Sequence, residues 1–312
     1  MSTTLKSPNE FDSLIELVMY FKDEATCLLF IEQSIHGGDI KCPHCGFDKP
    51  YRFKDGKRFK CRSCRSQFTA KIGTIFERSP IPLSKWFAIM YLMGTNKKGM
   101  SACAISRMLK MRRATVWFVM HRIRKAFVQN HIELKGIVQS DETFVGGKNK
   151  NRHIDKKVKY ENSKYRFSPD KTPVLGMLDD SGTVKAVVLK DAKFTSIRPI
   201  VMDSIQSGST WVTDSYLSVK TLSKYFKREI VNHHEKRYFS DSGYTTNGIE
   251  NFWSHLKRMI IGVYHQVSPK HLQRYCDELT FRFNTRHIGE GERFALLVSK
   301  CNTRLQYKHL IK

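Results

Sequence analysis

The sequence lacks any long apolar run. Its most apolar stretch, Trp86 to Met93, has eight residues, whereas a membrane-spanning helix needs about 20. The first residues, MSTTLKSPNEFDSL, are polar and acidic, without the basic start and apolar middle of a secretory signal. These absences argue against a membrane partner and against secretion, and we expect a soluble, cytoplasmic protein.

Acidic residues are missing from residues 81–130, which contain ten Lys or Arg. Residues 41–80 add eleven Lys or Arg against three acids, and the whole chain carries a formal charge of +25. General solubility is the alternative explanation, but fifty residues without one acid favour a polyanionic partner. We therefore expect double-stranded DNA as the partner and a location at the nucleoid.

The eight cysteines fall into two groups. Four stand alone, and we expect them to be small buried hydrophobes: Cys27, Cys103, Cys276 and Cys301. The other four form two CxxC pairs across a fifteen-residue spacer: Cys42, Cys45, Cys61 and Cys64. This spacing is typical of a tetrahedral zinc site, and two disulfides are the less favoured alternative in a cytoplasmic chain. Four thiolates leave no open position, so the zinc would be structural.

Residues 81–130 have helical periodicity. The apolar residues between Trp86 and Met93 predict one helix, and Ser101 to Leu109 and Thr115 to Phe127 predict two more in a helix-turn-helix-like arrangement. The last helix buries a stripe formed by Val116, Val119, Ile123 and Phe127. Four basic residues are left as candidate DNA contacts, namely Arg112, Arg113, Arg122 and Lys125. An ordinary three-helix bundle with a solvated basic face is the alternative.

From Gly136 the periodicity changes to alternating strands and helices. Three strands are followed by a helix, a strand, a helix near Leu217 to Phe226, a strand and further helices. This is the element order of an α/β ribonuclease H-like fold. The basic segment from Lys148 to Lys171 is predicted to be an insertion near the site.

Three acids occupy notable positions in this half. Asp141 lies on the first predicted strand, Asp214 at the end of the fourth, and Glu250 in the first turn of the following helix. Two Mg²⁺ or Mn²⁺ ions held by such carboxylates can activate an attacking oxygen and stabilise a leaving oxygen in phosphoryl transfer. An isolated Asp is more often a surface acid, but the order and spacing of all three favour a catalytic metal site. Glu142 should point to the opposite strand face.

At these residues the chain resembles a known family. The four-cysteine segment, the helical segment and the motifs SDETFVGG, VTDSY and TTNGIENFWSHLKRMIIGVYHQ resemble those of ISXO-type insertion-sequence transposases, a zinc-ribbon branch of the DDE superfamily. The resemblance implies DNA transposition on a ribonuclease H-like core, with Asp141 and Asp214 in the first two acidic positions. Members of this branch carry Asn, His or Glu in the third position, followed by a Lys.

Both Asn247 and Glu250 are candidates for that third position. Helix geometry favours Glu250, because it shares a face with Ser254 and Lys257 opposite the buried stripe. Asn247 would then be the helix N-cap. Lys257, two turns further on, is expected to grip DNA. His233 and His234 are possible water- or phosphate-positioning residues and equally possible surface residues.

These observations predict five segments. They are a helical N-terminal segment (1–36), a zinc ribbon (37–78), a helix-turn-helix-like segment (79–131), a ribonuclease H-like catalytic domain (132–290) and a C-terminal tail (291–312). We expect a metal-dependent transposase that acts as a homo-oligomer on element ends and target DNA, since two ends must be handled together. The alternatives are a non-enzymatic DNA-binding regulator with a degenerate catalytic domain and a plain nuclease.

Overall fold

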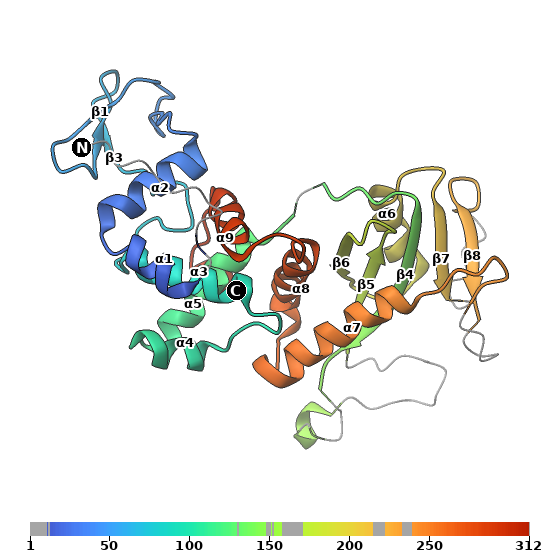
Figure 1. Cartoon of the computed structure of the whole chain (residues 1–312). Coiled ribbons are helices and arrows are strands. Elements are labelled where there is room, and N and C mark those ends of the chain that lie inside the picture. The colour runs from blue at the N-terminus through green and yellow to red at the C-terminus, as the bar shows by residue number, and fades with distance from the viewer. Residues whose placement is uncertain are drawn as a thin grey trace. The chain divides into compact units, whose positions relative to one another are not determined.

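The computed structural model describes residues 11, 13–129, 131–147, 151, 153–157, 171–214, 222–232 and 239–311. The chain forms two compact units: the first combines Met1–Val128 with Thr285–Lys312, and the second is Gln129–Asn284 (Figure 1). In the described part of the chain, no helix has both the length and the apolar character needed to cross a membrane.

The first unit is mainly helical. Its helices are α1 (Leu14–Tyr20), α2 (Glu24–His36), α3 (Leu83–Thr95), α4 (Ala102–Leu109), α5 (Arg113–Ala126), α9 (Glu290–Ser299) and α10 (Lys308–Ile311). A small antiparallel sheet separates α2 from α3 and consists of β1 (Tyr51–Arg52), β2 (Phe59–Lys60) and β3 (Gln67–Phe68). The three helices predicted between residues 81 and 130 are therefore present, and the stripe predicted on α5 is buried.

The C-terminal segment packs into this first unit. Phe294 of α9 stacks on Phe30 at a centroid distance of 5.8 Å and meets Phe87 edge-on at 5.4 Å. Cys301 is buried, and its carbonyl accepts a hydrogen bond from the backbone N–H of Ile75. The second unit thus ends at Asn284, whereas the sequence predicted a boundary at residue 290. Residues 291–312, predicted to be a tail, are part of the first unit. Aromatic residues distant in sequence share one core, and that core holds α9.

The second unit is built on a five-stranded sheet. Its strands are β4 (Ile137–Val145), β5 (Thr172–Leu178), β6 (Val184–Val188), β7 (Thr210–Asp214) and β8 (Lys227–Val231). The spatial order is β6-β5-β4-β7-β8, with β4 antiparallel to β5 and parallel to β7. This arrangement agrees with the predicted mixed α/β, ribonuclease H-like order.

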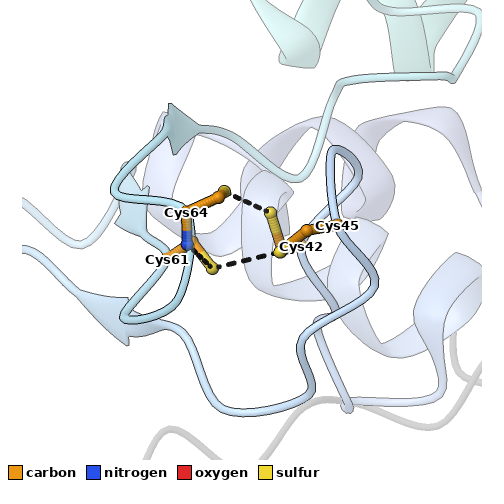
Figure 2. A group of neighbouring side chains, drawn as sticks. All are labelled: Cys42, Cys45, Cys61 and Cys64. Carbon is orange, nitrogen blue, oxygen red and sulfur yellow. Dashed lines mark hydrogen bonds between the residues drawn. The ribbon is translucent and has the colours of Figure 1, made fainter.

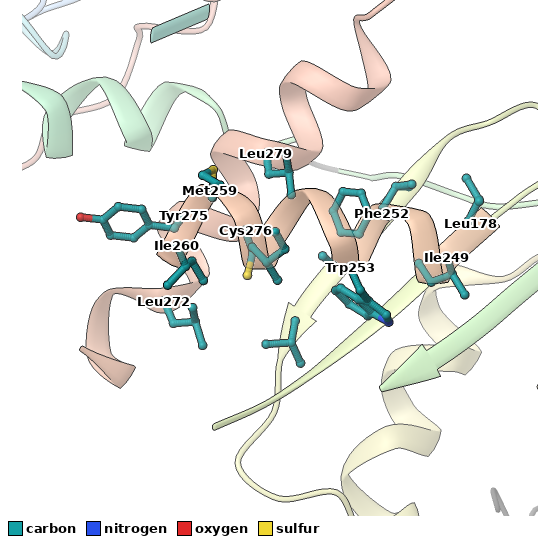
Figure 3. Packing of buried hydrophobic residues seen from close by; sticks show 14 residues of the cluster. Leu178, Ile249, Phe252, Trp253, Met259, Ile260, Leu272, Tyr275, Cys276 and Leu279 are labelled. Atoms are coloured by element: carbon teal, nitrogen blue, oxygen red, sulfur yellow. The ribbon is translucent and has the colours of Figure 1, made fainter. Parts of the chain in front are cut away.

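Helices cover both faces of this sheet. They are α6 (Phe194–Ser204), α7 (Asn247–Met259) and α8 (Pro269–Asn284). The unit also contains a short 3₁₀ helix, η3 (Ile154–Lys156), and a π-helical turn, η6 (Ile260–Tyr264), which follows α7. On one face, α7 and α8 pack on β5 and β6 through a cluster that includes Phe252, Trp253 and Cys276 (Figure 3). On the other face, α6 packs on β4, β5 and β7 around Trp211. The two faces are therefore both buried.

Some sequence predictions need correction or fall outside the described residues. The first half of the helix predicted near Leu217 to Phe226 is outside them, and the described half forms a turn in which the N–H of Tyr225 donates to the carbonyl of Leu222. Most of the segment 148–171 is also outside. Three of the lone cysteines are buried as expected, but Cys103 is exposed, because it lies on the open side of α4.

Candidate functional site

The four CxxC cysteines come together in the first unit (Figure 2). All four sulfur atoms lie within 4.8 Å of one another, with 3.6 Å between the Sγ atoms of Cys42 and Cys64 and 3.5 Å between those of Cys45 and Cys61. A tetrahedron with Zn–S bonds of about 2.3 Å has edges of about 3.8 Å. All four thiols are free. The cluster thus has the geometry of a closed zinc-ribbon site.

Each knuckle is shaped by its own backbone. The N–H of Cys42 donates to the carbonyl of Phe47, and the N–H of Cys61 donates to the carbonyl of Ser66. The same serine acts on the neighbouring thiol: its hydroxyl and N–H lower the pKa of Cys64 to about 6. A lowered thiol pKa favours the thiolate, which is the form that binds metal.

A tight hairpin links the two knuckles. The carboxylate of Asp55 accepts hydrogen bonds from the N–H of Lys57 and from the N–H and Nε of Arg58. These bonds, led by the one from Lys57, lower the pKa of Asp55 to about 2. The chain between the two CxxC pairs therefore turns back at Asp55-Gly56.

In the second unit, strand register places two acids side by side. Ser140 of β4 pairs with Thr213 of β7 in parallel register. The next residues are Asp141 and Asp214, and alternation along the strands directs both toward the face that α7 covers. Glu142 lies on the opposite face, as predicted.

Glu250 comes from the first turn of α7. This helix begins at Asn247, with Thr246 at the N-cap, so the prediction that Asn247 is the N-cap is corrected by one residue. The reason is that Thr245 and Thr246 already serve the helix start: the Thr245 hydroxyl accepts from the N–H of Asn247, and the Thr246 hydroxyl donates to Glu250 Oε1 at 3.1 Å. Asn247 and Glu250 are both exposed.

The carboxylates influence one another electrostatically. The pKa of Asp141 is raised to about 6, mainly by burial, and the negative charges of Glu250 and Asp214 contribute to the rise against the hydrogen bonds that lower the pKa. Burial, Asp141 and Asp214 together raise the pKa of Glu142 to about 7. Among the described residues, however, the cysteines are the only group of three or more potential ligands within 4.8 Å of one another. The three acids are neighbours in a looser cluster.

Sequence reasoning missed a direct contact to Asp141. The indole Nε1–H of Trp253 on α7 donates to Asp141 Oδ2 at 3.0 Å. Apolar periodicity assigned Trp253 to the buried stripe of the helix, and it is indeed buried. Periodicity reports the face of a helix and gives no information on which polar atom a buried indole meets.

The candidate DNA contacts differ in exposure. Arg112, Arg113, Lys125 and Lys257 are exposed. Arg122 is buried, which corrects its prediction as a DNA contact: its Nη2 donates to the carbonyl of Glu77 at 2.7 Å, and its guanidinium lies 5.1 Å from the centroid of the Trp86 ring. Burial lowers the pKa of Arg122 to about 10. His233 and His234 lie outside the described residues.

Comparisons with known proteins match both units. A model of the ISXO2-like transposase domain matches residues 133–284, and a model of the transposase zinc-ribbon domain matches residues 22–67. A relative from Halobacterium salinarum, described as an uncharacterized protein in transposable element ISH50, is 27% identical over 78% of this chain and 85% of its own length. An uncharacterized transposase-like protein from Haemophilus influenzae is 28% identical over 34% of this chain and 84% of its own length. Residues 133–284 thus match a transposase domain and residues 22–67 a transposase zinc ribbon, in agreement with the resemblance seen in the sequence motifs.

Proposed function

We propose that this chain binds the ends of an insertion sequence, hydrolyses a phosphodiester there and joins the freed 3′ hydroxyl to target DNA. One observation carries the proposal. Asp141 and Asp214 are adjacent on one face of the sheet, and Glu250 is close enough for its charge to raise the pKa of Asp141. A cluster of carboxylates in a basic protein is typical of a site whose bound cations would lie between the carboxylates and the DNA phosphates.

The three acids fit a pair of Mg²⁺ or Mn²⁺ ions. Carboxylate oxygens are the ligands these hard cations prefer, and the acids come from two adjacent strands and one helix start. Bound ions would supply activation of the attacking oxygen and stabilisation of the leaving oxygen. The chain itself orients Asp141 through Trp253 and Glu250 through Thr246. Glu250 is the proposed third ligand, and Asn247 is the competing candidate.

Lys257 is proposed to hold the DNA strand entering the site. It is exposed on α7, two turns beyond Glu250, a rise of about 10.5 Å along the helix. An exposed ammonium on the helix that carries Glu250 suits a contact with a backbone phosphate of the DNA.

The four cysteines are proposed to hold one structural zinc. A shell of four thiolates is closed, so the ion would order the ribbon and take no part in the chemistry. Arg112, Arg113 and Lys125 are the proposed contacts to element ends, since all three are exposed on or beside α5. Because the proposed substrate is double-stranded DNA, we expect the protein to act at the nucleoid in the cytoplasm.

A strand-transfer assay with linear element ends tests the proposal. Joined products in the presence of Mg²⁺ support a transposase, which we expect to assemble as a homo-oligomer because two ends must be joined together. Cut products alone indicate a nuclease, and a mobility shift alone indicates a DNA-binding regulator. Loss of joining in Asp141→Asn with retained DNA binding ties the activity to the carboxylates.

The contribution of α5 is tested through salt dependence. Each Lys or Arg that neutralises a phosphate releases counterions, so binding weakens as salt rises. Removing two contacts with Arg112→Ala and Arg113→Ala should lower the slope of log K against log salt by about 2. An unchanged slope contradicts the assignment of α5.

A further inference from the structure

We propose that Trp253 is a positioning residue for Asp141, and that Gly176 exists as a glycine to let the indole reach it. The inference rests on the proposed carboxylate site and deepens it. It names two residues outside the acids themselves, one on α7 and one on β5, that determine how Asp141 is presented. Its parts are a hydrogen bond, a steric clearance and a second anchor on the same helix.

The hydrogen bond joins the helix to the strand. Trp253 is 3% exposed, and its Nε1–H donates to Asp141 Oδ2 at 3.0 Å. A buried indole almost always finds an acceptor for its N–H, and a carboxylate is the strongest acceptor a protein offers. Because one oxygen of Asp141 is held in this way, the side chain has little rotational freedom. A carboxylate has about four lone-pair sites, so Asp141 can accept this hydrogen bond and still bind a cation.

The neighbouring strand leaves the space that the indole of Trp253 occupies. Gly176 of β5 pairs directly with Asp141 of β4. A Cβ atom at Gly176 would lie 2.5 Å from Cζ2 of Trp253 and 2.7 Å from Cδ1 of Ile249. Contacts of that length do not occur between packed carbon atoms. Any side chain at residue 176 would therefore push the indole away from the sheet and away from Asp141.

A second anchor holds the start of α7. The backbone N–H of Ile249 donates to Oε1 of Gln139, which is two residues before Asp141 on the same face of β4. A Cβ at Gly248 would lie 2.8 Å from that oxygen, so the close approach again requires a glycine. Gln139 and Asp141 thus bind α7 on both sides of Glu250. This double attachment sets the position of Glu250 relative to Asp141.

The opposite face of β4 provides a matched comparison. There the indole Nε1–H of Trp211 donates to the hydroxyl of Ser140 at 2.8 Å, and Trp211 is also fully buried. Two neighbouring residues of one strand therefore each receive a hydrogen bond from a buried tryptophan. Only the bond from Trp253 ends on one of the proposed metal ligands. Trp211 is accordingly the control for every structural effect of losing an indole.

The first test replaces each indole by a ring without a donor. Trp253→Phe and Trp211→Phe are compared with the unaltered full-length protein for Mn²⁺ binding in the absence of DNA. Loss of a partner that orients a metal ligand typically weakens metal binding by about 10–100-fold. We expect that loss for Trp253→Phe and less than about a twofold change for Trp211→Phe. Equal effects of the two variants, or none for Trp253→Phe, overturn the inference.

The second test observes the hydrogen bond in the metal-free protein, and its main variant, Asp141→Asn, keeps the indole of Trp253. In the protein labelled with ¹⁵N-tryptophan, the variants Trp253→Phe and Trp211→Phe assign the two indole N–H resonances, because each variant loses one of them. In Asp141→Asn, the resonance of Trp253 should shift, whereas that of Trp211 should not. Gly176→Ala should shift the same resonance through displacement of the ring. A Trp253 resonance unmoved in both variants overturns the inference. The proposed function is tested separately, by strand transfer in the unaltered protein and by its loss in Asp141→Asn.

Discussion

The two candidate metal centres of this protein are built in opposite ways. The four thiols come from two short knuckles in the first unit, and their sulfur atoms lie within 4.8 Å of one another. The three carboxylates of the second unit come from β4, β7 and α7, and they form a looser cluster. In the knuckles, local backbone hydrogen bonds shape the site. In the carboxylate cluster, the sheet register and the docking of α7 do so.

The difference follows from the charges of the two kinds of ligand. Protonated thiols carry no charge and do not repel one another, so four cysteines can be packed tightly even though Cys64 favours the thiolate. Carboxylates near neutral pH repel one another, and the raised pKa of Asp141 reflects its burial first and the charges of Glu250 and Asp214 in addition. A loose carboxylate cluster therefore needs firm support from neighbouring residues, which Trp253 and Gln139 supply.

Loss of a thiol should have the largest effect on folding. In Cys61→Ser we expect loss of about one zinc equivalent and disorder over residues 37–78, because a structural zinc contributes about 10–16 kcal/mol to folding of a small domain. Metal analysis and hydrogen exchange measure both effects. Cys103→Ser, which removes an exposed lone thiol, is the control and should keep its zinc. Full zinc content in Cys61→Ser would contradict the assignment.

Loss of a carboxylate should instead affect activity. Glu250→Gln removes one charge and one preferred oxygen ligand, so strand transfer should fall by more than about 100-fold. That value is the upper end of the loss expected when only a hydrogen-bond partner of a metal ligand is removed. DNA binding should persist. Asn247→Ala should keep most of the activity and change the free energy of unfolding by less than about 0.5 kcal/mol, as expected for an exposed residue. The reverse pattern would make Asn247 the third ligand.

The stability of the second unit should depend on pH when metal is absent. The pKa of Asp141 is raised from 3.8 to about 6, and that of Glu142 from 4.5 to about 7. The folded state then binds more protons than the unfolded state between about pH 4 and pH 7, so stability falls as pH rises through this range, by roughly 2–3 kcal/mol per carboxyl.

Chemical denaturation at several pH values measures this dependence. Asp141→Asn should flatten it, because the raised carboxyl is gone, and Mg²⁺ should oppose it by favouring the charged forms. In the ribbon, by contrast, the hydrogen bonds from Lys57 and Arg58 lower the pKa of Asp55. A second unit whose stability rises between pH 4 and pH 7 would contradict the described environment of Asp141.

The smallest effect concerns the local shape of a knuckle. Gly46 and Arg65 each stand four residues after the first cysteine of their pair, with φ of 77° and 61°. The left-handed conformation costs a non-glycine residue about 1–2 kcal/mol, but glycine also loses more chain entropy on folding. Arg65→Gly should therefore stabilise the zinc-loaded ribbon by about 1 kcal/mol or less, whereas Gly46→Ala should destabilise it. Thermal unfolding of the ribbon distinguishes these outcomes.

Much of the fold follows from local sequence. The CxxC spacing predicts the four-thiol cluster because a knuckle and a hairpin are short-range structures. Apolar periodicity predicts α3, α4, α5, α7 and α8, and alternation predicts β4 to β8. The order of these strands then predicts the sheet, since few topologies can connect them.

Only the tertiary structure decided which polar residues are buried and what they contact. Arg122 was expected on a solvated face, yet Trp86 and Glu77 cover it. Phe294 was expected in a tail, yet its ring completes an aromatic core with Phe30 and Phe87. Periodicity identifies the face of an element but not the partner packed against it. For the same reason, the sequence alone named Asp141 as a candidate ligand, while the packing of Trp253 against Gly176 determined how its carboxylate is held.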